Sequence, residues 1–292
     1  MIIDTHLHLI DKAALDYPWL AGVPPLDRSF SYAEYAEQAR ALGIEAALHM
    51  EVDVAEPDIE RETAHVARQA QEEGSLLQGA IASCRPERDD FPAMLERALA
   101  DPFVKGFRRV LHVMPDDLSE SALFRENIRL LGSTRLPFDL CVLPRQHGQA
   151  TALADHAPDT QFVLDHCGVP DIKGEALDPW REQIAELARR PNIAAKISGV
   201  IAYADGESWT AETLRPYVEH VIERFGWDRV VWGSDWPVCT LGGGLARWVD
   251  ATETLLRGAG EGEREKLLSA NARRIWQLGQ GRSPSPGGNG PR

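Results

Sequence analysis

The sequence predicts a (β/α)8 barrel, and two patterns support this fold. Eight short β-branched or apolar runs recur along the 292 residues, at 1–6, 44–50, 76–82, 103–109, 138–143, 161–166, 193–198 and 229–235. Amphipathic stretches of helical period separate them, among them 32–42, 59–73, 92–100, 180–190, 210–225, 246–257 and 263–277. Strands that alternate with helices favour a parallel sheet, and eight such units close a barrel. The alternative, a doubly wound open sheet, would place a glycine-rich phosphate turn after the first strand, where this sequence has none.

The composition agrees with one domain and a small-molecule substrate. Hydrophobic residues make up 43% and charged residues 26%, which is typical of a globular protein with a buried core. Because barrels often exceed about 250 residues as one domain, we predict a single domain over 1–280 and a disordered Pro/Gly/Ser-rich tail over 281–292. The formal charge of −14 argues against nucleic-acid and anionic membrane partners.

The N-terminus and the cysteines indicate a cytoplasmic enzyme. The chain opens without a basic segment followed by an apolar one, and it has no run of eighteen apolar residues. The four cysteines are isolated, so we expect reduced thiols rather than a disulfide framework or a structural zinc site. The sequence leaves oligomeric state open, including a homo-oligomer.

Local signals support the first helix and a long loop before it. Ser31 precedes Glu34 by three residues, the spacing of a helix capping box. Gly43 and Gly74 follow predicted helices, where glycine tolerates a left-handed terminal residue. The segment 10–30 is rich in proline and glycine, and we expect a loop over the top of strand one that forms a lid or a binding wall.

The first strand carries two histidines on one face. Side chains alternate along a strand, so His6 and His8 point in the same direction, into the mouth of a barrel. Two converging imidazoles suit a metal ion, or a pair of donors for a carbonyl oxygen. A chance pair in an N-terminal strand is the alternative.

Strands six and eight end in further polar groups. His166 closes an apolar strand, and a polar group in that position is costly unless it is satisfied or used. Asp235 ends strand eight, which neighbours strand one in a closed barrel. Gly233, on the same face, leaves space inside the barrel. We therefore predict Asp235 as a general base near His6 and His8; the alternative is a structural cap.

Other strand ends supply candidates for substrate contact. Alternation turns Arg108 inward on strand four, with Arg109 as the alternative if the register differs; the planar guanidinium suits a carboxylate or an oxygen-rich substrate. Lys196 and Ser198 share a face of strand seven. The complete set of expected substrate contacts is Arg108, Lys196, Trp19, Trp236 and Glu51. Three histidines in helical stretches are expected to be solvated: His65, His156 and His220.

These motifs together resemble the amidohydrolase superfamily, and specifically its amidohydrolase-2 group. The resemblance spans nearly the whole chain except the tail, and it rests on Asp4-Thr-His6-Leu-His8, Tyr17-Pro18-Trp19, Lys105-Gly106-Phe107-Arg108 and the segments 162–168, 231–237 and Asn271-Ala272. The sugar-lactonase branch, which includes L-fuconolactonase-like and L-rhamnonolactonase-like proteins, looks closest, and 2-pyrone-4,6-dicarboxylate lactonase also belongs to the group.

The resemblance implies a barrel that hydrolyses a lactone ring. His6, His8 and His166 map onto groups that polarise a carbonyl or bind a metal, and Asp235 maps onto the residue that activates water. Metal-dependent members often have a histidine at the end of strand five, but here strand five has none and His147 comes later. The resemblance thus leaves two options: no required cofactor, or one divalent metal (Zn or Mn) held by His6, His8, His166 and Asp235.

The sequence therefore predicts a hydrolase that opens a small lactone, most simply a sugar lactone. Asp235 would deprotonate the attacking water, and the histidines, or a metal they hold, would stabilise the oxyanion. The tryptophan that sugar lactonases often carry near the end of strand three is absent. Two alternatives remain: a metal-dependent decarboxylase or lyase acting on an aromatic or unsaturated acid, and a barrel retained only for binding.

Overall fold

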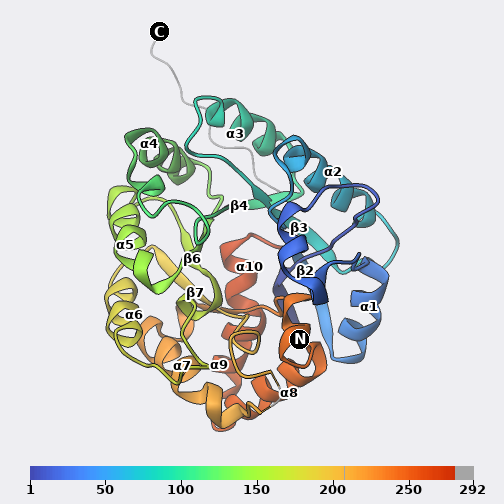
Figure 1. Ribbon diagram of the computed structural model, residues 1–292, viewed down its shortest axis with the longest axis vertical. Helices are drawn as coiled ribbons and strands as arrows, with labels where there is room; N and C mark the ends of the chain where they lie inside the picture. The colour runs from blue at the N-terminus through green and yellow to red at the C-terminus, as the bar shows by residue number, and fades with distance from the viewer. Residues whose placement is uncertain (207, 280–292) are drawn as a thin grey trace.

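The computed structural model, described over residues 1–206 and 208–279, is a parallel eight-stranded barrel ringed by helices (Figure 1). The strands follow chain order around the sheet: β1 Ile2–Leu7, β2 Ile44–Met50, β3 Leu77–Ser83, β4 Val104–Val110, β5 Phe138–Cys141, β6 Phe162–Leu164, β7 Ile193–Ile197 and β8 Val230–Trp232. The helices are α1 Tyr32–Ala41, α2 Ile59–Gln69, α3 Phe91–Ala100, α4 Ala122–Leu130, α5 His147–His156, α6 Trp180–Ala188, α7 Ala211–Phe225, α8 Leu245–Leu255, α9 Glu261–Glu265 and α10 Asn271–Ile275. The predicted fold class is confirmed.

Three strands end two or more residues earlier than predicted, and two of them end just before residues that were expected to be functional. β5, β6 and β8 stop two to three residues before the predicted 143, 166 and 235. Beyond β6, His166 adopts a left-handed backbone with φ +53°, and beyond β8, Asp235 does so with φ +56°. Such a conformation is uncommon for residues with a side chain and must be held in place by its surroundings. The chain therefore leaves the sheet just where its polar side chains begin.

The barrel closes between its first and last strands through a network around Asp4. The Asp4 carboxylate accepts hydrogen bonds from the backbone amides of His6 (3.0 Å) and Ser234 (2.8 Å), and from the Tyr35 hydroxyl (2.8 Å). The backbone amide of Asp235 donates to the carbonyl of His6 at 2.8 Å. One carboxylate thus fixes the ends of β1 and β8 to each other.

The end of the barrel nearest the strand starts is packed with apolar side chains. Ile3, Val163 and Val231 belong to a buried cluster that also includes Ile275 and Trp276 from the C-terminal helical region. This region was predicted as one helix over 263–277; it consists of α9, a π-helical segment Lys266–Ala270 and α10. In Figure 1, α10 lies inside the ring of outer helices. Burial of these side chains leaves the opposite end of the barrel for polar groups.

The long loop after β1 forms a wall over that opposite end. It includes a short 3₁₀ helix, Pro18–Gly22, and an antiparallel bridge between Ile10 and Phe30. The predicted capping box of α1 is confirmed, because the Ser31 hydroxyl accepts from the Glu34 amide at 3.2 Å and Glu34 accepts from the Ser31 amide at 2.8 Å. The predicted tail, 281–292, lies outside the described residues. Over the described part of the chain, no helix has the length and apolar character needed to span a membrane.

Candidate active site

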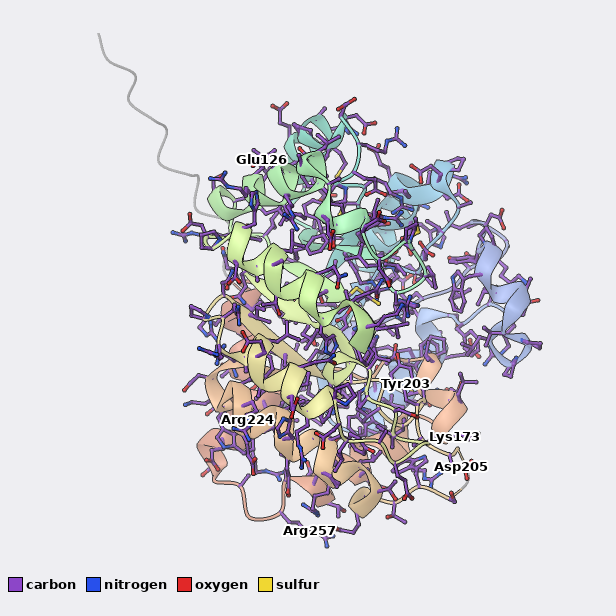
Figure 2. All side chains as sticks on the ribbon, turned by 60° about the vertical axis from the view of Figure 1, so that its left-hand side comes forward. Glu126, Lys173, Tyr203, Asp205, Arg224 and Arg257 are labelled. Carbon is purple, nitrogen blue, oxygen red and sulfur yellow. The ribbon has the colours of Figure 1, made fainter. Side chains whose placement is uncertain are left out.

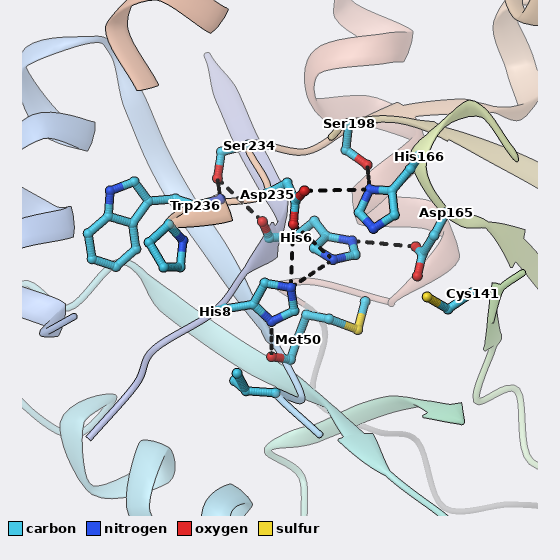
Figure 3. Close-up of polar contacts among 12 residues, drawn as sticks. His6, His8, Met50, Cys141, Asp165, His166, Ser198, Ser234, Asp235 and Trp236 are labelled. Carbon is cyan, nitrogen blue, oxygen red and sulfur yellow. Dashed lines mark hydrogen bonds and ion pairs between the residues drawn. The ribbon is translucent and has the colours of Figure 1, made fainter. Parts of the chain in front are cut away.

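His6 and His8 converge at the barrel mouth as strand alternation predicts (Figure 3). Their Nε2 atoms lie 3.1 Å apart, and both residues are buried. Burial and the positive charge of Arg108 lower the pKa of His8 to about 3. Burial and Lys196 hold the pKa of His6 well below its usual value. Both rings are therefore neutral at physiological pH, which leaves lone pairs to accept a proton or ligate a metal.

The hydrogen bonds of the two rings fix the protonated nitrogen of His8 but leave both neutral tautomers open for His6. His8 Nδ1 lies 3.0 Å from the carbonyl oxygen of Met50, which can only accept, so Nδ1 is protonated and Nε2 carries the lone pair. His6 Nδ1 lies between the Lys196 ammonium (3.2 Å) and a carboxylate oxygen of Asp165 (3.4 Å). Because one neighbour donates and the other accepts, either neutral tautomer of His6 is satisfied.

The third histidine, His166, is held beside the other two by its unusual backbone. Its ring centroid lies 4.5 Å from that of His6, and its Nδ1 lies 3.0 Å from the Ser198 hydroxyl. Gly199, at φ +67°, packs against it, and a Cβ there would lie 2.5 Å from His166 Nδ1. Burial lowers the pKa of His166. The close approach therefore requires glycine at position 199.

Asp235 faces all three histidines. Its Oδ1 atom lies 3.4 Å from His8 Nε2 and 3.7 Å from His6 Nε2, while Oδ2 lies 3.9 Å from His166 Nδ1. Burial raises the pKa of Asp235 to about 6, although His166 and Arg108 oppose the rise. A cavity-lining carboxylate with such a pKa is ionised at neutral pH yet basic enough to take a proton from water.

Beneath the histidines lies a buried ionic cluster in which Asp165 is central. The Lys196 ammonium contacts Asp165 Oδ1 at 2.9 Å and also binds Asp139. Burial favours the neutral form of Asp165, but Lys196 and His6 outweigh it and hold the pKa of Asp165 well below its usual value. Sequence reasoning missed Asp165 because strict alternation turns it away from His166; the left-handed turn after Leu164 brings both side chains to the site.

Arg108 faces inward from β4, which confirms the register over the alternative at Arg109. Its Nε donates to Glu51 Oε1 at 2.6 Å and its NH2 to the Glu51 carbonyl at 2.7 Å, while NH1 lies 3.4 Å from Asp165. Arg109 instead pairs with Glu87. The positive charge of Arg108 is therefore already compensated by two carboxylates.

Within residues 1–206 and 208–279, two groups of side chains have the spacing of a metal site, and they share His6. One consists of His6, His8 and Asp235, and the other of His6, His166 and Asp165. Ligands of a tetrahedral zinc ion with bonds near 2.0–2.1 Å lie about 3.3 Å apart, and the three atoms of the first group are separated by 3.1, 3.4 and 3.7 Å. The four residues predicted as one site are thus divided between two groups, and His8 and His166 belong to different ones.

A cavity of about 460 Å³ opens above these groups. Of the expected substrate contacts, Arg108 and Trp19 line it. Lys196, Glu51 and Trp236 do not: each is at least 98% buried behind the lining, so they hold other groups in place rather than offering a surface to substrate.

The lining also contains polar residues that were not among the predicted contacts, among them Tyr203 and His112. Tyr203 packs edge-on to His166 with ring centroids 6.0 Å apart, and its hydroxyl has no hydrogen bond to any residue in the described part of the chain. The Lys173 amide donates to the Tyr203 carbonyl at 3.1 Å, and Figure 2 shows the two residues close together. His112 follows β4, with its Nδ1 3.1 Å from Cys141 Sγ. Both residues lie in irregular segments that carry no periodic signal.

Of the three histidines predicted to be exposed to solvent, one is buried. His65 and His156 are partly exposed and pair with Asp11 and Glu126. His220 was expected to be solvated, and this is wrong: it is 6% exposed, because its ring packs on Trp180 and its Nε2 lies 2.8 Å from the Arg181 carbonyl. His147 begins α5 and contacts the Gly168 carbonyl at 3.0 Å.

A parallel barrel with histidines and carboxylates gathered beyond the carboxyl ends of its strands has the architecture of a barrel enzyme. The chain belongs to the amidohydrolase family, whose model matches residues 3–278.

Among its relatives, an L-fucono-1,5-lactonase from Burkholderia ambifaria is 27% identical, and the match covers 94% of this chain and 95% of that protein. A crystal structure of an amidohydrolase from Burkholderia multivorans with bound zinc has a TM-score of 0.86 at 26% identity, covering 95% of this chain and 99% of that chain. The structure of 5-carboxyvanillate decarboxylase from Sphingomonas paucimobilis has a TM-score of 0.66 at 15% identity, with coverage of 95% and 99%, which is a likeness of fold alone.

Proposed function

We propose that this protein hydrolyses the ring ester of a small lactone. The observation that carries the proposal is Asp235, a buried carboxylate with a pKa of about 6 that lines the cavity and faces three neutral imidazoles. Full-length similarity to a protein named L-fucono-1,5-lactonase supports a lactone as the substrate, and a sugar lactone is the class that this name favours.

Asp235 supplies the base for the first step. Its carboxylate removes a proton from a water molecule, and the oxygen of that water adds to the ring carbonyl. When the tetrahedral intermediate collapses, the bond between the carbonyl carbon and the ring oxygen breaks. Asp235 then returns the proton to the leaving alkoxide, and the product is a hydroxy acid. Base and acid are thus the same residue, and atoms and charge balance over the cycle.

The developing oxyanion requires donors on the cavity floor. His8 does not supply one, because its Nδ1 proton is directed at Met50 and its Nε2 carries the lone pair. Arg108 NH1 lies 3.3 Å from His6 Nε2 on the same floor and can donate. The Tyr203 hydroxyl, which has no partner among the described residues, is a second donor, and burial keeps its pKa well above its usual value, so it stays protonated.

The same floor fits a divalent metal. His6, His8 and Asp235 have the spacing of its ligands, and a cation there would act as a Lewis acid on the carbonyl and lower the pKa of water. His6 is suited to both states, because its Nδ1 accepts from Lys196 when Nε2 is protonated and donates to Asp165 when Nε2 is a ligand. The bound zinc of the Burkholderia multivorans structure supports zinc as the ion to test.

Without a bound metal, the decarboxylase alternative is the weaker one on electrostatic grounds. An aromatic acid substrate needs a cation for its carboxylate, and Arg108, which lines the cavity, is already paired with Glu51 and Asp165. The similarity to decarboxylases is one of fold alone.

The test is a pH-indicator assay on a panel of 1,4- and 1,5-lactones, each with and without a chelator, alongside a 5-carboxyvanillate sample monitored for carbon dioxide. We expect turnover of at least one lactone and no decarboxylation. Activity that survives chelation would assign oxyanion stabilisation to Arg108 and Tyr203, whereas activity restored only by zinc or manganese would assign it to a metal. Decarboxylation without lactone turnover would refute the proposal.

A further inference from the structure

The walls of the active-site cavity are far less polar than its floor. Floor groups are His8, Arg108, His166 and Asp235, whereas the walls are built mainly from aliphatic side chains on the loops that follow six different strands. Representative wall residues are Ile10, Val23, Val52, Val113, Val238 and Leu241. Because these side chains come from six separate loops, the aliphatic character belongs to the whole cavity and not to one segment.

The aliphatic character continues to the rim, where it is exposed to solvent. Val113 is 65% exposed and Leu241 is 38% exposed, and both line the cavity. Among the described residues only six large hydrophobic side chains are exposed, the other four being Met1, Leu99, Leu123 and Leu130. Apolar side chains left in water around a concave site are typical of a surface that a ligand covers.

The walls offer few hydrogen-bond partners to a substrate with many hydroxyl groups. The Trp19 indole N–H already donates a hydrogen bond to the Val52 carbonyl at 2.7 Å. The polar side chains that remain above the floor as partners for a substrate are mainly Asp53, His112 and Tyr203. Hydroxyl groups buried against aliphatic side chains lose their hydrogen bonds to water without replacement, and this weakens binding.

The charge of the cavity also restricts the substrate. Arg108 is the single arginine or lysine in the described lining, and Glu51 and Asp165 neutralise it. No unpaired side-chain cation is therefore available in that lining for a substrate carboxylate or phosphate. A neutral molecule enters without an electrostatic cost.

From the aliphatic walls, the exposed apolar rim and the compensated floor, we infer that the substrate is a neutral lactone with a hydrocarbon substituent, such as an alkyl chain on the carbon next to the ring oxygen. The inference rests on the proposed lactone hydrolysis and specifies its substrate class. The ring carbonyl lies on the polar floor beside Asp235, and the alkyl chain runs along the wall towards Val113 and Leu241.

The test compares lactones that share one ring and differ in the substituent: δ-valerolactone, δ-octanolactone and δ-decalactone, with D-glucono-1,5-lactone and L-fucono-1,5-lactone as polyhydroxylated counterparts. We expect kcat/KM to rise about two- to four-fold per added carbon, so at least about thirty-fold from δ-valerolactone to δ-decalactone. We also expect both sugar lactones to lie below δ-octanolactone.

A rim variant tests whether these walls cause the preference. In Leu241→Ser, the ratio of kcat/KM for δ-decalactone to that for δ-valerolactone is expected to fall about three- to ten-fold. Leu130, 41% exposed on α4 and absent from the cavity lining, provides the matched control, and Leu130→Ser is expected to leave the ratio unchanged.

The outcomes separate this inference from the proposed function. If the enzyme hydrolyses lactones but prefers the sugar lactones, or if the ratio is the same in Leu241→Ser and the wild type, the inference is overturned and lactone hydrolysis stands. If none of the five lactones is hydrolysed and a wider panel is also inert, the proposed function itself fails.

Discussion

The two ends of the barrel interior are built from the same eight strands but differ in chemistry. The end near the strand starts is filled by aliphatic side chains such as Ile3, Val163 and Val231, which need no hydrogen-bond partners. The other end buries Lys196, Asp165 and Asp139 in full, each at or below 1% exposure. Buried charges are costly unless paired, so the second end is stable only as a complete network. The apolar end therefore stabilises the fold, whereas the polar end lowers the folding stability in order to hold reactive groups in place.

The largest expected effect comes from the group that the polar end presents to substrate. Asp235→Asn keeps the shape of the side chain but cannot take a proton from water. We expect kcat on a good lactone substrate to fall by about 10²- to 10⁴-fold, with an unchanged thermal unfolding midpoint as the control for folding. Near-normal turnover would remove Asp235 from the mechanism.

Removal of the Lys196 ammonium should destabilise the ionic network at the polar end of the barrel. Lys196→Met removes the ammonium that Asp139 and Asp165 share, which leaves Asp165 with Arg108 as its remaining cation, and we expect the free energy of unfolding in urea to fall by about 3–5 kcal/mol. The double variant Lys196→Met/Asp139→Leu, which removes one of the stranded carboxylates, should regain part of this loss. Stability of the single variant equal to that of the wild type would contradict a paired network.

The apolar end should respond to truncation mainly in stability. Trp276→Ala opens a cavity under the barrel and is expected to cost about 3–5 kcal/mol of unfolding free energy. The kcat of the enzyme that remains folded should fall far less than in Asp235→Asn, because the Trp276 ring reaches the polar cluster only through the Lys196 ammonium, 5.6 Å from its centroid. A kcat loss comparable to that of Asp235→Asn would show that the two ends are coupled.

The dependence of kcat/KM on pH should follow the protonation of the Asp235 carboxylate at the polar end of the barrel. Since burial raises the pKa of Asp235 to about 6, the base is protonated below that pH, and kcat/KM of chelator-treated enzyme should fall about ten-fold per unit below pH 6. A bound divalent cation favours the ionised carboxylate, so the acid limb of the metal-loaded enzyme should lie at lower pH. A metal-free profile that is flat between pH 5 and 7 would exclude Asp235 as the titrating base.

The smallest effect is expected at the junction between β1 and β8. Tyr35→Phe removes one donor to the Asp4 carboxylate and should cost about 1 kcal/mol in unfolding free energy. We also expect a kcat loss of less than about ten-fold, since Asp4 keeps its bonds to the His6 and Ser234 amides. Tyr32→Phe, which removes a hydroxyl bonded to the Leu76 amide on the outside of the barrel, is the matched control, and it should leave kcat unchanged.

Strand periodicity was sufficient to predict the barrel and the inward direction of His6, His8 and Arg108, because alternation acts locally and the barrel supplies the neighbours. It failed beyond the strand ends. The positive φ of His166 depends on the glycine at 199 and on Ser198, which come from β7 and the residues after it, and no local pattern encodes that contact. For the same reason, the roles of Asp165 and Tyr203 emerge only from the assembled structure.

The junction around Asp4 has a consequence for how the enzyme is made. His6 and His8 leave the ribosome long before Asp235, but the backbone of Asp235 hydrogen-bonds to His6, and the bond from Ser234 to Asp4 spans 230 positions of the chain. A polypeptide interrupted anywhere before its last strand therefore has the two imidazoles of β1 and the residue after it but lacks Asp235, the base of the proposed mechanism. In that mechanism the reactive groups come together only when the final strand completes the barrel.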